Sequence, residues 1–253
     1  MTTKYSKLFA LIFVTFCLAF YYCYYLGSSD SYFKEVEVSS LTLMSNNRVV
    51  YIAVDIIEDV YRIRGWTHLK STVVGWGMSD ESLSAISVYV IRVDCQSVTA
   101  LAVPRSVARS VIPLDDNLYL YRKGDGDIYR FDCGEAVIIS QDEASRVRRR
   151  FSNPLEKHCK AHGWDYYNEF LHDSDPKKNP PHEFSLNGKK IEIKLSFAYT
   201  TVGKRSRPQT LDLKINGPEG RLFSKTFEYI YWKQVTKDEW NEVVDTPGVL
   251  RLK

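Results

Sequence analysis

The sequence predicts an α+β fold that is mainly antiparallel β and follows one amino-terminal transmembrane helix. Three observations predict it. An uncharged, apolar run opens the chain from Leu8 to Leu26. Short segments of alternating apolar and polar residues, separated by turn sequences, fill most of the remainder. Helix-capping patterns occur at only a few points between them. We expect a membrane helix, a β-rich sandwich or curled sheet, a short helical segment and a carboxyl-terminal β-meander with a short helix.

The composition is that of a folded protein with one or two domains. The chain has 253 residues, of which 44% are hydrophobic and 26% are charged, which is enough for a core. Its 34 Lys and Arg against 31 Asp and Glu give a net charge of +3. This small excess is far below that of a dedicated nucleic-acid binder, so we expect no nucleic-acid partner.

The run over residues 8–26 has the length and the flanking charges of a membrane span. A helix of this length covers about 28 Å, roughly one hydrocarbon core. Lys4 and Lys7 precede the run, whereas acidic residues outnumber basic ones just after it. Positive flanks stay inside, so we expect residues 1–29 to be a cytoplasmic stub and an anchor, with the bulk of the chain outside the cytoplasm. The alternative is a signal peptide cleaved after Ser29.

Residues 30–140 are expected to form the β-rich domain. Apolar residues alternate over 50–56 and 89–95, and turn residues at 115–117 and 123–126 predict hairpins. The absence of intervening helices favours antiparallel pairing. Further strands are expected over 60–66, 68–76, 97–103, 117–122, 127–133 and 136–140.

Residues 141–172 are expected to be helical. Ser140 and Glu143 fit a capping box that opens a helix to about residue 151. Asn153 as N-cap and Pro154 as first helical residue start a second helix, which should end at Gly163. Asp165 can cap a third, over 166–172. The polar, proline-bearing residues 173–181 are expected to be a linker.

Residues 182–253 are expected to form a β-meander with one short helix. Alternation over 191–199, 211–215 and 223–231 predicts three strands with one wet face each. A capping box from Thr236 to Glu239 predicts a helix, whose Trp240, Val243 and Val244 should cover this meander.

Two strands carry the same pattern, apolar-Arg-apolar-Asp-Cys, and end at Cys95 and Cys133. An extended chain places the Arg and Asp side chains on one face and the Cys side chain on the other. If the strands are neighbours across a sheet or core, an oxidising compartment favours a Cys95–Cys133 disulfide. Two buried thiols are the alternative.

A basic cluster on the first predicted helix is a candidate binding patch. It consists of Arg146, Arg148, Arg149 and Arg150. Such a cluster can bind lipid headgroups, an envelope polymer or an acidic protein surface. The alternative is a solvated helix face whose charges are paired nearby.

His158 and His162 are weak candidates for a metal site. Their i,i+4 spacing lets two imidazoles reach one metal. The glutamate of the metalloprotease motif is absent, and no third ligand has a diagnostic spacing. We therefore expect no metal and no other cofactor.

The function predicted from these observations is binding by a membrane-anchored envelope protein. The chain has no nucleophile elbow, phosphate loop, dinucleotide fingerprint or C-x-x-C pair. We expect its extracytoplasmic domain to bind another protein or an envelope component, as an accessory, inhibitor-like or immunity-like module. The absence of an N-x-S/T sequon favours a bacterial inner membrane facing the periplasm. One alternative is an envelope hydrolase with dispersed catalytic residues, for which His68 and the histidines of residues 158–172 are the candidates. The other is a structural subunit of a membrane assembly.

Overall fold

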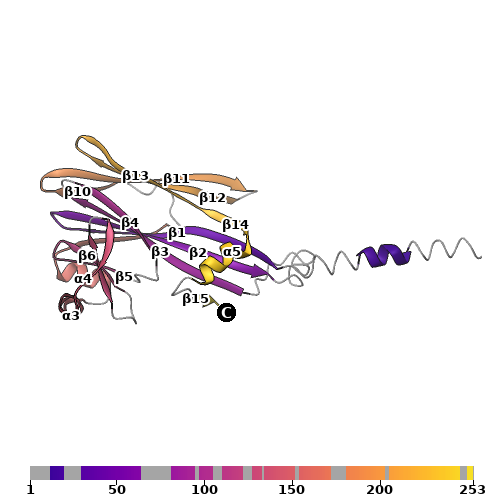
Figure 1. The fold of residues 1–253 in the computed structure, drawn as a ribbon. Coiled ribbons are helices and arrows are strands. Elements are labelled where there is room, and N and C mark those ends of the chain that lie inside the picture. The colour runs from indigo at the N-terminus through magenta and orange to yellow at the C-terminus, as the bar shows by residue number, and fades with distance from the viewer. Residues whose placement is uncertain are drawn as a thin grey trace, which may run out of the picture.

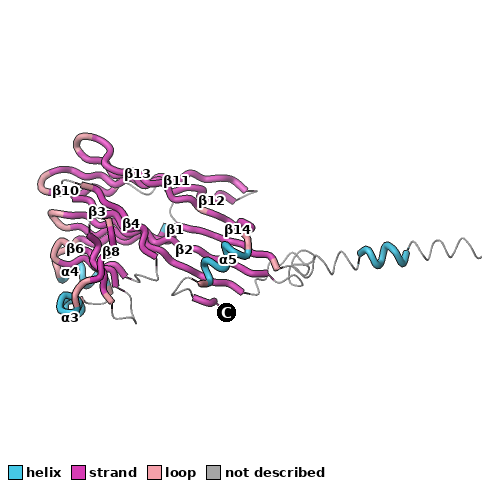
Figure 2. Tube along the Cα trace, viewed as in Figure 1, coloured by secondary structure: helices cyan, strands magenta, loops and turns pink. Residues whose placement is uncertain are grey.

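The computed structural model describes residues 12–19 and most of residues 30–252 (Figure 1). Within the second range, residues 64–80, 95–96, 105–109, 122–126, 133, 152–153, 172–180, 203–204 and 246–249 lie outside the description. Strands dominate the described residues and pair only antiparallel (Figure 2). The prediction of a mainly antiparallel β fold with a few short helices is confirmed.

The central sheet has seven strands, built around three long neighbouring ones. Its path is β14-β1-β2-β3-β15, and β9 and β4 extend it beside β1 and β3. The strands are β1 (Ser31–Ser45), β2 (Val49–Ile63), β3 (Glu81–Asp94), β4 (Val98–Pro104), β9 (Asp165–Phe170), β14 (Ile230–Val235) and β15 (Leu250–Leu252).

Two four-stranded sheets accompany the central sheet. We call them the hairpin sheet and the meander sheet. The hairpin sheet contains β5 (Ser110–Leu114), β6 (Asn117–Tyr121), β7 (Ile128–Asp132) and β8 (Glu135–Ile138). The meander sheet contains β10 (His182–Leu186), β11 (Lys189–Val202), β12 (Arg205–Gly217) and β13 (Gly220–Glu228).

The central sheet is covered on both faces at the end where β1 turns into β2. The core shared with the meander sheet includes Leu41, Leu43, Ile52, Ile91, Ile193, Leu213 and Ile215. The core shared with the hairpin sheet includes Met44, Tyr51, Val90, Leu118, Leu120, Phe131 and Trp164. Residues 49–54 of β2 are therefore buried on both faces, which explains their unbroken apolar run. Separate strands over 50–56 and 60–66 were the wrong prediction, because β2 continues through to Ile63.

The predicted helix over residues 166–172 is also wrong, because Asp165–Phe170 is strand β9. It pairs with the second half of β1, and Thr42 Oγ1 donates a hydrogen bond to Asn168 Oδ1 at 2.8 Å. The segment is rich in aromatic residues, which favour a pleated surface once an edge is available. The edge of β1 therefore determines the conformation of this segment.

The carboxyl-terminal strands do not all stay in the meander sheet. The predicted strand over 223–231 divides at Tyr229, and β14 and β15 pair with β1 and β3. The Tyr229 N–H donates to the Gln209 carbonyl at 2.8 Å, and its hydroxyl donates to the Val38 carbonyl at 3.3 Å. This residue therefore marks the crossing from the meander sheet to the central sheet.

The helix-capping predictions hold at two of four positions, and the cap predicted at Asp165 fails because that residue begins β9. Ser140 caps α3 (Gln141–Arg150), and Thr236 with Glu239 forms the capping box of α5 (Lys237–Val244). Pro154, not Asn153, is the N-cap of α4 (Leu155–Ala161). Asn153 lies outside the described residues.

Helix α5 covers the central sheet, not the meander as predicted. Trp240 and Val243 pack with Tyr32, Val60 and Leu83. The helix follows directly after β14, which is paired to β1, so this face of the central sheet is the nearest apolar surface.

Only part of the predicted membrane span is described. Residues 12–19 form a helix with exposed side chains, whereas 8–11 and 20–26 lie outside the description. Within the described part of the chain, no helix is both long and apolar enough to cross a membrane.

Candidate functional site

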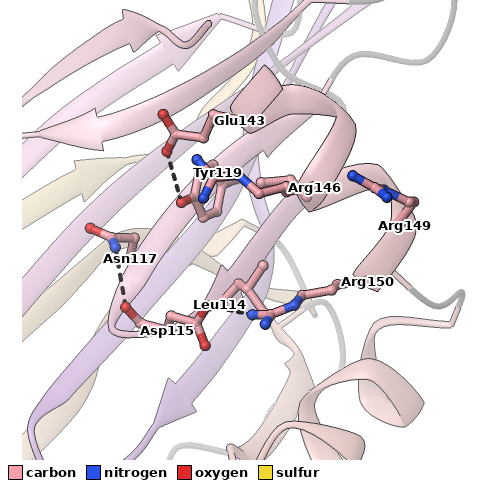
Figure 3. Close-up of a pocket in the computed structure, with 9 residues that line it drawn as sticks. Leu114, Asp115, Asn117, Tyr119, Glu143, Arg146, Arg149 and Arg150 are labelled. Atoms are coloured by element: carbon pink, nitrogen blue, oxygen red, sulfur yellow. Dashed lines mark hydrogen bonds and ion pairs between the residues drawn. The ribbon is translucent and has the colours of Figure 1, made fainter. Parts of the chain in front are cut away.

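A cavity of about 480 Å³ lies between helix α3 and the β5–β6 hairpin (Figure 3). We call it the arginine cavity. It is lined by Leu114, Asp115, Asn117, Tyr119, Glu143, Arg146, Val147, Arg149 and Arg150. Three of the four arginines predicted as a patch therefore meet in one place, because positions i, i+3 and i+4 share a helix face. Arg148 is exposed and does not line the cavity.

The β5–β6 turn forms one wall and has a constrained backbone. Asp115 and Asp116 have φ values of 48° and 64°, as a two-residue hairpin of type I′ requires. The Asp116 carboxylate accepts hydrogen bonds from Asn46 Nδ2 at 2.6 Å and Arg48 Nη1 at 2.8 Å. Tyr51 donates its hydroxyl to the Asp116 carbonyl at 2.9 Å. The turn is thereby fixed to the turn between β1 and β2.

Helix α3 forms the opposite wall, and its apolar face fixes its rotation. Ala144 and Val147 are buried against the hairpin sheet, in a cluster with Ile112, Leu114 and Ile128. The Ser140 hydroxyl accepts the Glu143 N–H at 3.3 Å and satisfies one of the free donors of the first turn. With that face held, Arg150 reaches the β5–β6 turn, Arg146 lies beside Tyr119 and Glu143, and Arg149 lies at the outer side of the cavity (Figure 3).

The charges in the cavity are only partly balanced. Arg150 Nη1 lies 2.5 Å from Asp115 Oδ2. Glu143 Oε1 accepts from Tyr119 at 3.1 Å and from Arg130 Nη1 at 3.2 Å. Arg146 and Arg149 form no ion pair with any described residue. Two positive charges therefore face the cavity without a partner carboxylate, an arrangement that favours an anion.

Tyr119 remains a phenol in this setting. Burial, together with its hydrogen bond to Glu143, raises the pKa of Tyr119 to about 12. The hydroxyl therefore stays protonated over the whole physiological pH range. It donates its hydrogen bond to the Glu143 carboxylate from the hairpin sheet.

His158 connects the segments that form the two walls of the cavity. It is fully buried, and its Nε2 lies 2.9 Å from the Pro113 carbonyl oxygen of β5. A second hydrogen bond joins it to the backbone of Arg150, the last residue of α3. One side chain of α4 therefore links both walls of the cavity.

The histidine pair is engaged in hydrogen bonds to the backbone. The His158 and His162 rings stack at 4.3 Å, and His162 Nδ1 lies 2.9 Å from the His158 carbonyl oxygen. Among the residues that the structure describes, no group of three or more His, Cys, Asp or Glu side chains is placed to hold a metal. Cys159 follows His158 in the sequence. Burial raises the pKa of its thiol to about 12, which keeps the thiol protonated.

Comparison with protein-family models, with curated protein sequences and with solved structures found no match. The function of the cavity is therefore argued from its own residues. Of these, Asp115, Asn117, Tyr119 and Glu143 were not predicted as site residues. The sequence indicated Asp115 and Asn117 only as a turn, and Glu143 as a cap and as one possible ion-pair partner of the arginines, because nothing local shows which turn faces the arginine-rich helix.

The predicted disulfide partners, Cys95 and Cys133, lie outside the described residues. The preceding Arg and Asp side chains do share a face, as predicted, because Arg92 pairs with Asp94 and Arg130 with Asp132, each at 3.5 Å. Their strands, β3 and β7, belong to different sheets that share a core. The Cys95–Cys133 bond stays a prediction.

Stability is expected to fall in mild acid because of His158. Burial lowers its pKa below the ordinary value of about 6.5, so the unfolded chain binds a proton that the folded chain resists as the pH falls through that value. Burial shifts His182 in the same direction. We expect His158→Gln to reduce the slope of the unfolding free energy against pH by up to about 1.4 kcal/mol per pH unit below pH 6.5. Urea unfolding of both forms between about pH 7.5 and 5.5 measures it. Equal slopes would contradict the assignment.

Proposed function

We propose that this chain is a single-pass, amino-terminally anchored envelope protein. Its extracytoplasmic domain captures another protein or an envelope component by an anionic group seated in the arginine cavity. The observation that carries the proposal is the pair Arg146 and Arg149, which face a cavity of about 480 Å³ without a partner carboxylate among the described residues. The apolar run from Leu8 to Leu26 supports the anchor.

The chemistry of the cavity favours a carboxylate or a phosphate. A guanidinium presents its N–H groups as a planar fork, which matches two oxygens of such an anion. Arg150 is already engaged by Asp115, so its fork is available only to an anion that displaces that carboxylate. Arg146 and Arg149 therefore provide the first contacts.

Anion titration tests the proposal. Pyrophosphate and a small tricarboxylate are titrated into the purified full chain in detergent, with calorimetric detection. The variant carrying Arg146→Gln and Arg149→Gln is expected to lose about tenfold in affinity or more, since one charge-assisted hydrogen bond is worth about 1.5–3 kcal/mol before solvent screening. Arg148→Gln is the matched control, because Arg148 lies on the same helix but outside the cavity.

Two results would contradict the proposal. One is equal anion affinity in the double variant and in the natural chain. The other is an equal loss with Arg148→Gln, which would indicate a diffuse charge effect. Crosslinking of the anchored protein in its membrane then identifies the partner, and the partner should be lost from the double variant but retained by Arg148→Gln.

A further inference from the structure

The end of the molecule opposite the arginine cavity carries a group of aromatic and basic side chains. We call this group the aromatic rim. It consists of Tyr231, Trp232 and Lys233 of β14, Arg207 of β12, and Phe33 and Tyr61 beneath the Trp232 ring. The cavity is fixed to the turn that ends β1, whereas the rim lies where β1 begins and β2 ends (Figure 1).

Trp232 is held in an unusual conformation. Its φ is 47°, in the left-handed region that bulky residues rarely adopt. It lies in a bulge, where Tyr231 and Trp232 oppose the single residue Glu35 of β1. Its ring stacks on Phe33 at 5.0 Å with an interplanar angle of 10°, and it lies 4.9 Å from the Tyr61 ring. The bulge and the two rings together hold the indole at the surface.

The outer side of this indole is uncovered. Trp232 is 43% exposed, although a ring of this size could have been buried by a regular strand. Strain retained at an exposed residue points to a use for that residue. An indole with an apolar body and a polar N–H suits a boundary between water and an apolar phase.

Two basic residues accompany the aromatic residues of β14: Lys233 follows Trp232 in the strand, and Arg207 of β12 contacts Tyr231. The Arg207 guanidinium lies 5.2 Å from the centre of the Tyr231 ring, in a cation–π contact. Neither Arg207 nor Lys233 forms an ion pair with any residue that the structure describes. The nearby carboxylate of Glu35 accepts the Tyr61 hydroxyl at 3.2 Å. Lys233 is close enough to the Glu239 carboxylate to help lower its pKa, but neither cation is held in a direct ion pair among the described residues. The rim therefore combines cations with aromatic rings, which is the composition of membrane-interface anchors.

We propose that the aromatic rim rests on the lipid headgroups of the membrane that holds the anchor. This inference depends on the anchor of the proposed function but not on the arginine cavity. Phe33 follows the predicted span by seven residues, so the intervening chain reaches about 25 Å at most. The rim is therefore the part of the domain that the tether keeps beside the bilayer.

Site-specific photocrosslinking tests the contact. A benzophenone amino acid replaces either Trp232 or Leu222 in the full chain, which is reconstituted into vesicles of phosphatidylethanolamine and phosphatidylglycerol. Leu222 is a matched control because it is 45% exposed and lies beside the β12–β13 turn, at the other end of β12 from Arg205. We expect several-fold more lipid adduct from position 232, and we expect Arg207→Glu with Lys233→Glu to reduce that yield.

A second measurement keeps the natural indole in place. In vesicles whose lipids carry brominated acyl chains, Trp232→Phe is expected to lower the fraction of tryptophan fluorescence that the bromines quench. A lipid yield at 232 no greater than at 222, or adducts only to a second copy of the chain, would overturn the proposal while the anchor stands. Release of the whole chain by an alkaline wash would overturn the anchor, and the rim proposal with it.

Discussion

Leu213→Ala is expected to lower the free energy of unfolding by about 3 kcal/mol. Leu213 is fully buried in β12, where its side chain contributes to the core shared by the meander sheet and the central sheet. Truncation removes apolar contacts and leaves a cavity that close-packed neighbours fill only partly. Equilibrium urea unfolding of the chain in detergent measures the loss.

The same experiment tests whether the two sheets unfold together. The chain has five tryptophans, so the measurement uses a background in which Trp66, Trp76 and Trp232 are changed to Phe. The remaining Trp164 and Trp240 report on the central sheet, because they pack in its other two clusters. Since the mutated core is shared, their fluorescence should shift with the circular dichroism in one transition. Leu222→Ala, on the same sheet but 45% exposed, is expected to change stability by about 0.5 kcal/mol or less. If the urea midpoint of the fluorescence transition of Trp164 and Trp240 is unchanged by Leu213→Ala, the two sheets unfold independently.

His158→Ala is expected to cost about 2–3 kcal/mol of stability and also to weaken anion binding. The change leaves the Pro113 carbonyl without its buried partner and removes the hydrogen bond to the backbone of Arg150. Both losses fall on segments that position the walls of the arginine cavity. The measurements are urea unfolding and the pyrophosphate titration.

Two control variants separate the effects of His158→Ala. His162→Ala removes a half-buried ring at the C-cap of α4, whose hydrogen bond among the described residues is to the His158 carbonyl, and it should leave anion affinity unchanged. His158→Gln keeps a side-chain donor near the Pro113 carbonyl and should recover part of both losses. Full anion affinity in His158→Ala, despite lower stability, would show that His158 does not position the cavity.

Local signals account for the parts of the fold that the sequence predicts correctly. The alternation over residues 191–199 gives β11, and the residues at Ser140 and Thr236 start α3 and α5, because each depends on neighbours within a few positions. Residues 166–172 were predicted as a helix, whereas Asp165–Phe170 is a strand, since the edge of β1 that makes it one lies more than a hundred residues earlier. The assignment of β14 and β15 to the central sheet is likewise non-local.

For the candidate site too, the sequence predicts the local part, which is the arginine-bearing helix, but not the opposite wall. Basic residues on one predicted helix identified Arg146, Arg149 and Arg150, but also Arg148, which lies outside the cavity. The opposite wall depends on Asp116, which is fixed by Asn46 from 70 positions earlier in the chain. No short pattern in the sequence records that contact, so the cavity becomes visible only when the sheets are assembled.

The length of β1 has a consequence for where a partner is met. Its 15 residues, at about 3.3 Å each, separate the tethered end from the arginine cavity by about 45 Å. In the proposed arrangement, with the aromatic rim on the bilayer and β1 directed away from it, that distance is several times the Debye length of about 8 Å at physiological salt. The cavity would then meet ligands beyond the field of the lipid phosphates, where diffusing molecules and membrane proteins that project equally far can reach it.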